Sequence, residues 1–300
     1  MADSRAQAYA QQLDALTRQA EALTPEARIR IVKLLDEANR EILADLARSK
    51  PGSYNAARLQ ALKAQIDRVM EQFARQASSQ VSDLERQAYQ KAAQSVDATV
   101  AAGTGGLMVQ PVIDTAALQV VQGYTADLIT GLTRDASSKI NAAIQRAYLG
   151  GANLEQLVEQ IGSTLEDGKF SGLFSQVGER AMTIATNEIM RVHSLASMSR
   201  IKALAPHHPG LSKLWRHIPV ARVPRISHLL ADGQIRKPGE PFLVEGEELQ
   251  YPRDPSGSAE NTINCHCLLV PHIGDDDLKP TDQERQLLAH HGISVESVHG

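Results

Sequence analysis

Prolines are distributed unevenly along this chain, and their positions limit where long helices can form. Ten of the 13 prolines follow Ala205, whereas the earlier part of the chain contains three, at positions 25, 51 and 111. A proline inside a helix removes a backbone hydrogen bond and clashes with the preceding turn. We therefore expect long helices before Ala205, and short elements joined by turns after it.

The composition is that of an ordinary folded protein. Its 300 residues are 42% apolar and 22% charged, with a net charge of −4, so a globally basic nucleic-acid-binding protein is not expected. No apolar run approaches the roughly 20 residues of a membrane span, and the first residues lack the pattern of a secretory signal. We expect no membrane partner and a reducing cytoplasm, in which both cysteines stay free or bind a metal.

Amphipathic patterns predict helix after helix in the first half. Thr24-Pro25-Glu26 combines a capping residue, a first-turn proline and an acid, and predicts a helix start. Further helices are predicted over residues 55–101, 111–149, 153–165 and 174–204. The clearest apolar stripe has heptad spacing and comprises Leu59, Leu62, Ile66, Val69 and Phe73. Such stripes either pack within the chain or are left for a partner helix or another subunit.

Short extended segments follow Pro209. Residues 214–218, 242–244 and 262–270 have the composition or alternation of strands. Turns are predicted at Asp232-Gly233, at Pro238-Gly239 and over residues 254–257. The sequence therefore predicts an α+β fold: a long helical N-terminal region, then a small compact domain with a packing helix and a short antiparallel sheet.

Five short motifs occur in order within this second half, after Trp215. They are Arg225-x-x-His228, Asp232-Gly233-Gln234, Phe242 followed by Gly246, Tyr251-Pro252-x-Asp254-Pro255, and Asn264-Cys265-His266-Cys267. The ordered set resembles the C-terminal domain of phage head-morphogenesis proteins, the Mu F-like minor head protein family, over about residues 176–272. The chain departs from the family pattern at His266, where Arg is usual, and at Ala185-Thr186-Asn187-Glu188, where Arg-Thr-Glu is frequent.

The resemblance implies a domain organisation, partners and a location. Residues 1–175 would be a helical region that contacts portal or capsid, residues 176–273 the Mu F-like head-morphogenesis domain, and residues 274–300 a tail. The protein would be a minor component of the virion, in the capsid interior or at the portal vertex, after assembly in the host cytoplasm. Its partners would be the portal protein and the major capsid or scaffolding protein, with packaged DNA as a further candidate.

A mechanism of recognition follows from these expectations. The apolar seams of residues 55–101 and 111–149 would lie in a groove of the portal or capsid subunits. The compact domain would be a rigid plug built around Trp215, His228, Phe242, Tyr251 and the cysteine pair. Residues 206–300 contain nine basic and 13 acidic residues, which argues against duplex binding by this half.

The two cysteines form the most chemically specific pattern. On a strand, Cys265-x-Cys267 would place both thiols on one face, with His266 on the other. Two thiolates and an imidazole suit zinc, and His228 is the first candidate for a third ligand, with His272 the second. The alternative, which the sequence favours, is that these Cys and His residues are buried structural side chains.

An enzyme is the main rival hypothesis. Glu188, Arg225, His228 and Cys265 could form an acid–base or nucleophilic set in a metal-dependent hydrolase or nuclease. The sequence lacks a nucleophile elbow, a zinc-protease motif and a phosphate-binding loop. A buried ion pair between Arg225 and Glu188 is the favoured structural explanation for those two residues.

Overall fold

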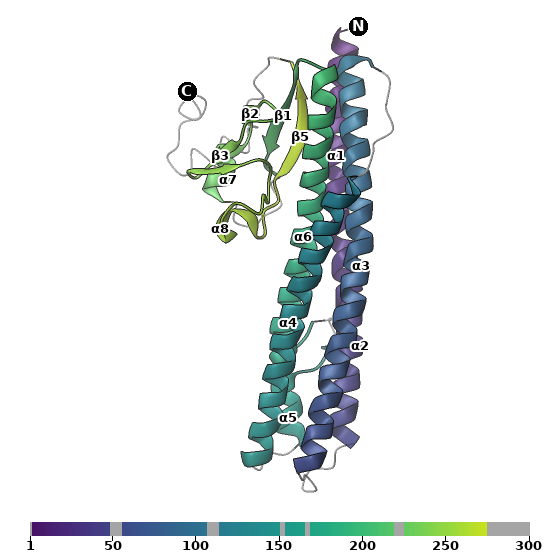
Figure 1. Ribbon diagram of the computed structural model, residues 1–300, viewed down its shortest axis with the longest axis vertical. Coiled ribbons are helices and arrows are strands. Elements are labelled where there is room, and N and C mark those ends of the chain that lie inside the picture. Colours follow the sequence, from purple (N-terminus) through teal and green to yellow (C-terminus); the bar gives the residue numbers. More distant parts are fainter. Residues whose placement is uncertain are drawn as a thin grey trace. The chain divides into compact units, whose positions relative to one another are not determined.

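The computed structural model describes residues 2–48, 56–106, 114–150, 154–165, 169–218 and 225–274, and it has an α+β fold (Figure 1). The α+β prediction is confirmed. Within the described ranges, no helix combines the length and the apolar character needed to cross a membrane. The predicted C-terminal tail, residues 274–300, lies outside these ranges apart from its first residue.

Long helices make up the first two thirds of the chain. They are α1 (Ala2–Glu21), α2 (Leu23–Arg48), α3 (Ala56–Thr104), α4 (Thr115–Gly150), the short α5 (Leu154–Ile161) and α6 (Gly172–Leu204). Both α3 and α6 match their predicted ranges within three residues. The predicted start at Thr24 is slightly wrong, because α2 begins at Leu23 and Thr24 lies in its first turn.

The heptad stripe of α3 is part of the chain's own core. Leu62, Ile66, Val69 and Phe73 are each at most 5% exposed. The apolar positions of α4 are also buried, including Leu132 and Ile140. The expectation that these seams dock onto a portal or capsid groove is therefore wrong for these residues, because the chain folds back and covers them itself.

The chain forms two compact units, each assembled from separate segments. We call them the sheet unit (Met1–Leu23, Glu85–Leu118 and Ile189–Gly300) and the helical unit (Thr24–Leu84 and Gln119–Glu188). Since α3 and α6 each contribute to both units, the sequence boundary predicted between residues 175 and 176 falls inside α6 and does not separate them.

The sheet unit contains two small antiparallel sheets in its described part. The first has the order β2-β1-β5, formed by β1 (Leu211–Arg216), β2 (Ile235–Arg236) and β5 (Leu268–Ile273). The second pairs β3 (Phe242–Val244) with β4 (Glu247–Leu249). Two short helices, α7 (Ile226–Ala231) and α8 (Ala259–Thr262), and the 3-10 turn η1 (Ala205–His207) complete the unit. The register places Trp215 opposite Leu269.

One face of the first sheet packs against α1 and α6, and the other packs against the second sheet together with parts of α3 and α6. One apolar cluster joins α1 and α6 to β1 and β5 through Leu16, Ala20, Met190, Leu214, Leu268 and Val270. A second cluster surrounds Trp215 and includes Phe242, Val244, Leu249, Cys265 and Cys267, together with Val96 and Met198 of α3 and α6. Figure 1 shows β1 and β5 running beside the upper part of α6. The plug predicted around Trp215 is therefore part of a larger core that includes two of the long helices, α3 and α6.

The predicted strand over residues 262–270 is wrong in its first part. Residues 259–262 form α8, whose N-cap Ser258 accepts a hydrogen bond from the Asn261 amide. Asn264 has a φ of 54°, a left-handed conformation that a regular strand does not allow. The strand itself begins at Leu268. Local capping and a left-handed residue thus override an alternating pattern that is typical of strands.

Candidate functional site

Three residues with metal-ligating side chains meet inside the sheet unit. His228 comes from α7, and Cys265 and Cys267 come from the loop that leads into β5. One ligand atom from each lies within 4.8 Å of the other two, and Cys267 Sγ is 3.5 Å from His228 Nδ1. All three side chains are at most 3% exposed. The structure thus brings the two cysteines together with His228, the first candidate for a third ligand.

An irregular loop, and not a strand, buries both cysteines and leaves the residue between them exposed. Cys265 and Cys267 are buried, whereas His266 between them is exposed. The buried guanidinium of Arg253 donates hydrogen bonds to the carbonyl oxygens of both cysteines, at 2.9 Å for Cys267. Arg191 Nε of α6 in turn donates to the Arg253 carbonyl oxygen at 3.0 Å. Arg253 therefore links the cysteine loop to a long helix.

Trp215 stands next to this cluster and is fully buried. Its ring meets the His228 ring edge-on at 5.9 Å between centroids, and it meets the Phe242 ring similarly at 5.5 Å. Such edge-to-face contacts stabilise aromatic pairs beyond simple burial. Trp215 thereby restricts the position of the His228 imidazole.

The Asp-Gly-Gln turn holds Trp215 through its backbone. The Trp215 amide donates to the Gln234 carbonyl oxygen, and the Gly233 amide donates to the Trp215 carbonyl oxygen, both at 3.0 Å. Gly233 has a φ of 80°, which glycine adopts at low cost. Asp232 is buried and accepts a hydrogen bond of 2.6 Å from the His217 amide. This motif is therefore structural in the described fold.

The Tyr-Pro-x-Asp-Pro segment is also held internally. Asp254 accepts hydrogen bonds from the Gln250 amide at 2.8 Å and from the Ser256 hydroxyl at 2.7 Å. Pro252 is buried, and Tyr251 packs against the cluster around Trp215. Burial raises the pKa of Tyr251 to about 12, so its phenol is neutral at physiological pH. The segment forms a rigid turn whose x position is Arg253.

Other residues predicted for the site lie elsewhere. His272 is buried on β5 opposite Ser212 and is outside the group of three. Arg225 donates a hydrogen bond of 2.6 Å to the Ile263 carbonyl oxygen. Glu188 is buried on α6 in the helical unit, where it accepts a hydrogen bond from Asn187. The ion pair between Arg225 and Glu188 stays a prediction.

The two thiols differ in their tendency to ionise. Burial opposes ionisation of Cys265, but a hydrogen bond with Cys267 and the charge of Arg253 outweigh it and hold the pKa of Cys265 well below its usual range. The pKa of Cys267 is raised by burial and by the neighbouring Cys265. The pair can bind a soft cation when both thiols are deprotonated.

Sequence reasoning missed three buried cationic or imidazole side chains around the site. They are Arg253, Lys213 and His193. Lys213 donates to the Gln250 carbonyl oxygen and lies 4.8 Å from the centre of the Phe242 ring, and burial lowers its pKa to about 8. His193 is fully buried on α6, and burial and Arg253 lower its pKa to about 4. No signal marks Arg253 in advance, because it occupies the variable position of its motif.

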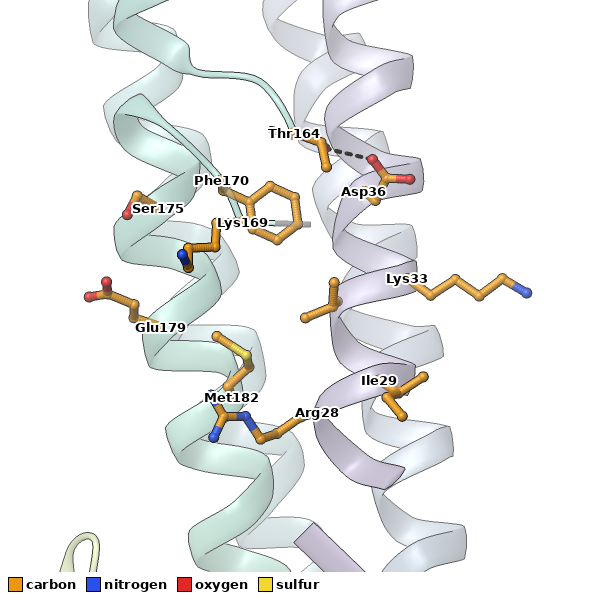
Figure 2. A pocket seen from close by; sticks show the side chains of 11 residues that line it. Arg28, Ile29, Lys33, Asp36, Thr164, Lys169, Phe170, Ser175, Glu179 and Met182 are labelled. Atoms are coloured by element: carbon orange, nitrogen blue, oxygen red, sulfur yellow. Dashed lines mark hydrogen bonds between the residues drawn. The ribbon is translucent and has the colours of Figure 1, made fainter. Parts of the chain in front are cut away.

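The helical unit contains a separate pocket of about 690 Å³. It lies between α2 and the start of α6, and its lining includes Arg28, Ile29, Asp36, Phe170, Glu179 and Met182. Figure 2 shows the Phe170 ring between the two helices, with Thr164 facing Asp36 and Lys33 extending away. Thr164 Oγ1 donates to Asp36 Oδ1 at 2.6 Å. The pocket mixes apolar surface with charges of both signs and groups none of the predicted site residues.

Comparisons with known proteins give a limited similarity. The chain is 32% identical over 111 residues to the uncharacterized protein YqbB of Bacillus subtilis (strain 168). The match covers 36% of this chain and 35% of YqbB, so the chain spans about a third of the length of that relative. No family model matches the chain, and no solved structure matches it.

Proposed function

We propose that this protein is a phage minor head protein that acts in head morphogenesis by binding the portal protein and the major capsid or scaffolding protein. The observation that carries the proposal is the convergence of the five ordered motifs on one core. The five motifs contribute His228, the Asp232 turn, Phe242, Arg253 and the cysteine loop. These contact Trp215, contact one another or share partners in the sheet unit. Motifs that are separate in sequence thus serve a single domain, as expected if the resemblance extends over the whole domain.

Recognition is favoured over catalysis by the burial of the chemically active residues. The metal-dependent hydrolase or nuclease considered above needs His228 or the cysteines to reach a substrate. These three side chains and Glu188 are each at most 3% exposed. The described arrangement supports a stable domain that presents its outer surface to partners.

Partner contact on this proposal uses exposed side chains, because the predicted seams are buried. On α4, Val120 is 74% exposed and Tyr124 is 48% exposed. These residues are one helical turn apart and therefore lie on the same side of α4. Exposed aliphatic and aromatic side chains next to each other are typical of contact surfaces. We assign the portal-binding contact to this part of the helical unit.

Cross-linking mass spectrometry of assembled heads tests the proposal. We expect cross-links between residues 55–149 and the portal protein in particles that carry the wild-type chain. Val120→Ser combined with Tyr124→Ser should reduce these cross-links and the amount of protein in particles. Ser138→Ala, at another exposed position of α4, should change neither. Heads that contain the double variant at the wild-type level and with the same cross-links would contradict the assigned contact.

A further inference from the structure

We propose that His228, Cys265 and Cys267 bind one Zn²⁺ ion that fastens the cysteine loop to α7. This inference goes beyond the proposed function and does not depend on it. It assigns a structural metal centre to the core of the sheet unit.

The donor atoms suit zinc in type and in spacing. Two sulfur atoms and one imidazole nitrogen form a common set of zinc ligands. Zinc–sulfur and zinc–nitrogen bonds of about 2.3 and 2.0 Å at a tetrahedral angle separate the two ligand atoms by roughly 3.5 Å. The measured separation between Cys267 Sγ and His228 Nδ1 is 3.5 Å. With all three donors within 4.8 Å of one another, one ion can contact the set after small side-chain movements.

Hydrogen bonding alone does not explain why an imidazole is buried at this position. His228 Nε2 is buried and has no hydrogen-bond partner among the described residues. The other ring nitrogen, Nδ1, contacts the thiol of Cys267, a weak hydrogen-bonding group. A metal ion bound at Nδ1, the nitrogen that faces the thiol of Cys267, replaces this weak contact with a strong one, and it leaves Nε2 unpaired.

The surrounding backbone holds the thiols in a converging arrangement before any metal binds. Arg253 donates to the carbonyl oxygens of both cysteines, and Arg191 connects Arg253 to α6. Trp215 packs edge-on against the His228 ring. Supports of this kind orient metal ligands and raise affinity. A site that is ordered in advance loses less conformational freedom when the ion binds.

A divalent ion can bind here without adding net charge. Arg253 places a buried positive charge next to the cysteine loop. A Zn²⁺ ion with two thiolates is neutral, so it adds no net charge to this core, and unpaired buried charge is costly. A structural zinc ion is four-coordinate, so a fourth ligand completes the set of three protein donors. Because the ligands are buried, we assign the ion a structural role and not a catalytic one.

Metal analysis of the purified full-length chain tests this inference. We expect one zinc ion per chain after purification without chelators. We also expect thiolate-to-metal charge-transfer absorption when Co²⁺ replaces the zinc. Cys265→Ser, Cys267→Ser and His228→Gln should each weaken binding by more than the roughly 10- to 100-fold that is typical of losing a supporting residue. His266→Gln, at the exposed position between the cysteines, and His272→Gln, outside the group, should keep one ion per chain.

The cobalt spectrum of the wild-type chain keeps the test decisive if a variant fails to fold. A wild-type chain that contains no zinc and gives no thiolate–cobalt absorption would overturn the inference. A disulfide between Cys265 and Cys267 in protein purified under reducing conditions would overturn it too, as would full zinc content in the Cys265→Ser, Cys267→Ser double variant. None of these results bears on the cross-links to the portal, so the two proposals fail separately.

Discussion

The guanidinium of Arg253 donates a hydrogen bond of 2.9 Å to the carbonyl oxygen of Cys267. Both residues are buried, and Arg253 adopts a φ of 67°, which is unusual for a residue with a side chain. Arg253 therefore combines a strained backbone with a buried positive charge. Its hydrogen bonds fix the loop that carries the two thiols.

Replacing Arg253 should destabilise the sheet unit strongly. Arg253→Met removes the donors to two buried carbonyl oxygens, and each unsatisfied group costs about 1–3 kcal/mol. We expect the free energy of unfolding to fall by about 3 kcal/mol or more. Arg253→Lys, which keeps the charge but not the paired donors, should lower the free energy of unfolding by less. Urea unfolding measures both variants, and an unchanged midpoint for Arg253→Met would refute the role given to this residue.

His193 should make the fold sensitive to acid. Its pKa in the folded protein is about 4 against an ordinary value of 6.5, because burial and Arg253 disfavour the charged ring. Between these two pH values, the unfolded chain therefore binds a proton at His193 and the folded chain does not. Titration of His193 therefore leaves the free energy of unfolding unchanged above pH 6.5. It lowers that free energy as the pH falls from 6.5 towards 4, by a total on the order of 3 kcal/mol.

Denaturant unfolding at pH 7 and pH 4.5 checks the effect of His193. The wild-type chain should lose stability between these two values, and His193→Gln should lose about 2 kcal/mol less. His207→Gln, at an exposed position of η1, serves as the control and should behave as the wild type. Equal pH dependence in the wild type and in His193→Gln would show that the imidazole does not titrate as described.

Neighbouring residues of β3 should respond very differently to truncation. Phe242 is fully buried against Trp215, whereas Leu243 is 56% exposed. Phe242→Ala should cost about 3–5 kcal/mol, and Leu243→Ala should stay within about 0.5 kcal/mol. Fluorescence of Trp215, the single tryptophan of the chain, follows unfolding in both variants. Similar losses in the two variants would mean that β3 does not present Phe242 to the core.

Zinc removal should weaken the fold if the metal centre forms. A ligand that binds the folded chain at about a thousand times its dissociation constant adds about 4 kcal/mol of stability. We expect a chelator to lower the thermal midpoint of the wild-type chain and to leave that of the Cys265→Ser, Cys267→Ser double variant unchanged. A midpoint that a chelator does not move in the wild type would argue against a structural ion.

Much of the fold was predictable because its signals are local. Proline density, the heptad stripe of α3 and the first-turn residues of α2 indicated long helices before Ala205 and short elements after it. The apolar run at Phe242 predicted β3 correctly. The sequence did not predict what the apolar stripes pack against, because only the folded chain shows that Ile66 and Phe73 are covered by its own helices.

The candidate site was predictable only in part. Donor chemistry pointed to Cys265, Cys267 and His228, and these residues meet in the structure. The reasoning that a strand aligns the two thiols was wrong, since the segment is a loop that Arg253 supports. Long-range contacts of this kind leave no periodic trace in the sequence, and neither does the left-handed backbone at Asn264.

Quantitative mass spectrometry of purified procapsids and finished heads tests most directly whether this chain works in head assembly. The proposal predicts that the chain is present in procapsids, at far fewer copies than the major capsid protein. Its complete absence from procapsids and heads that assemble normally would contradict the proposal.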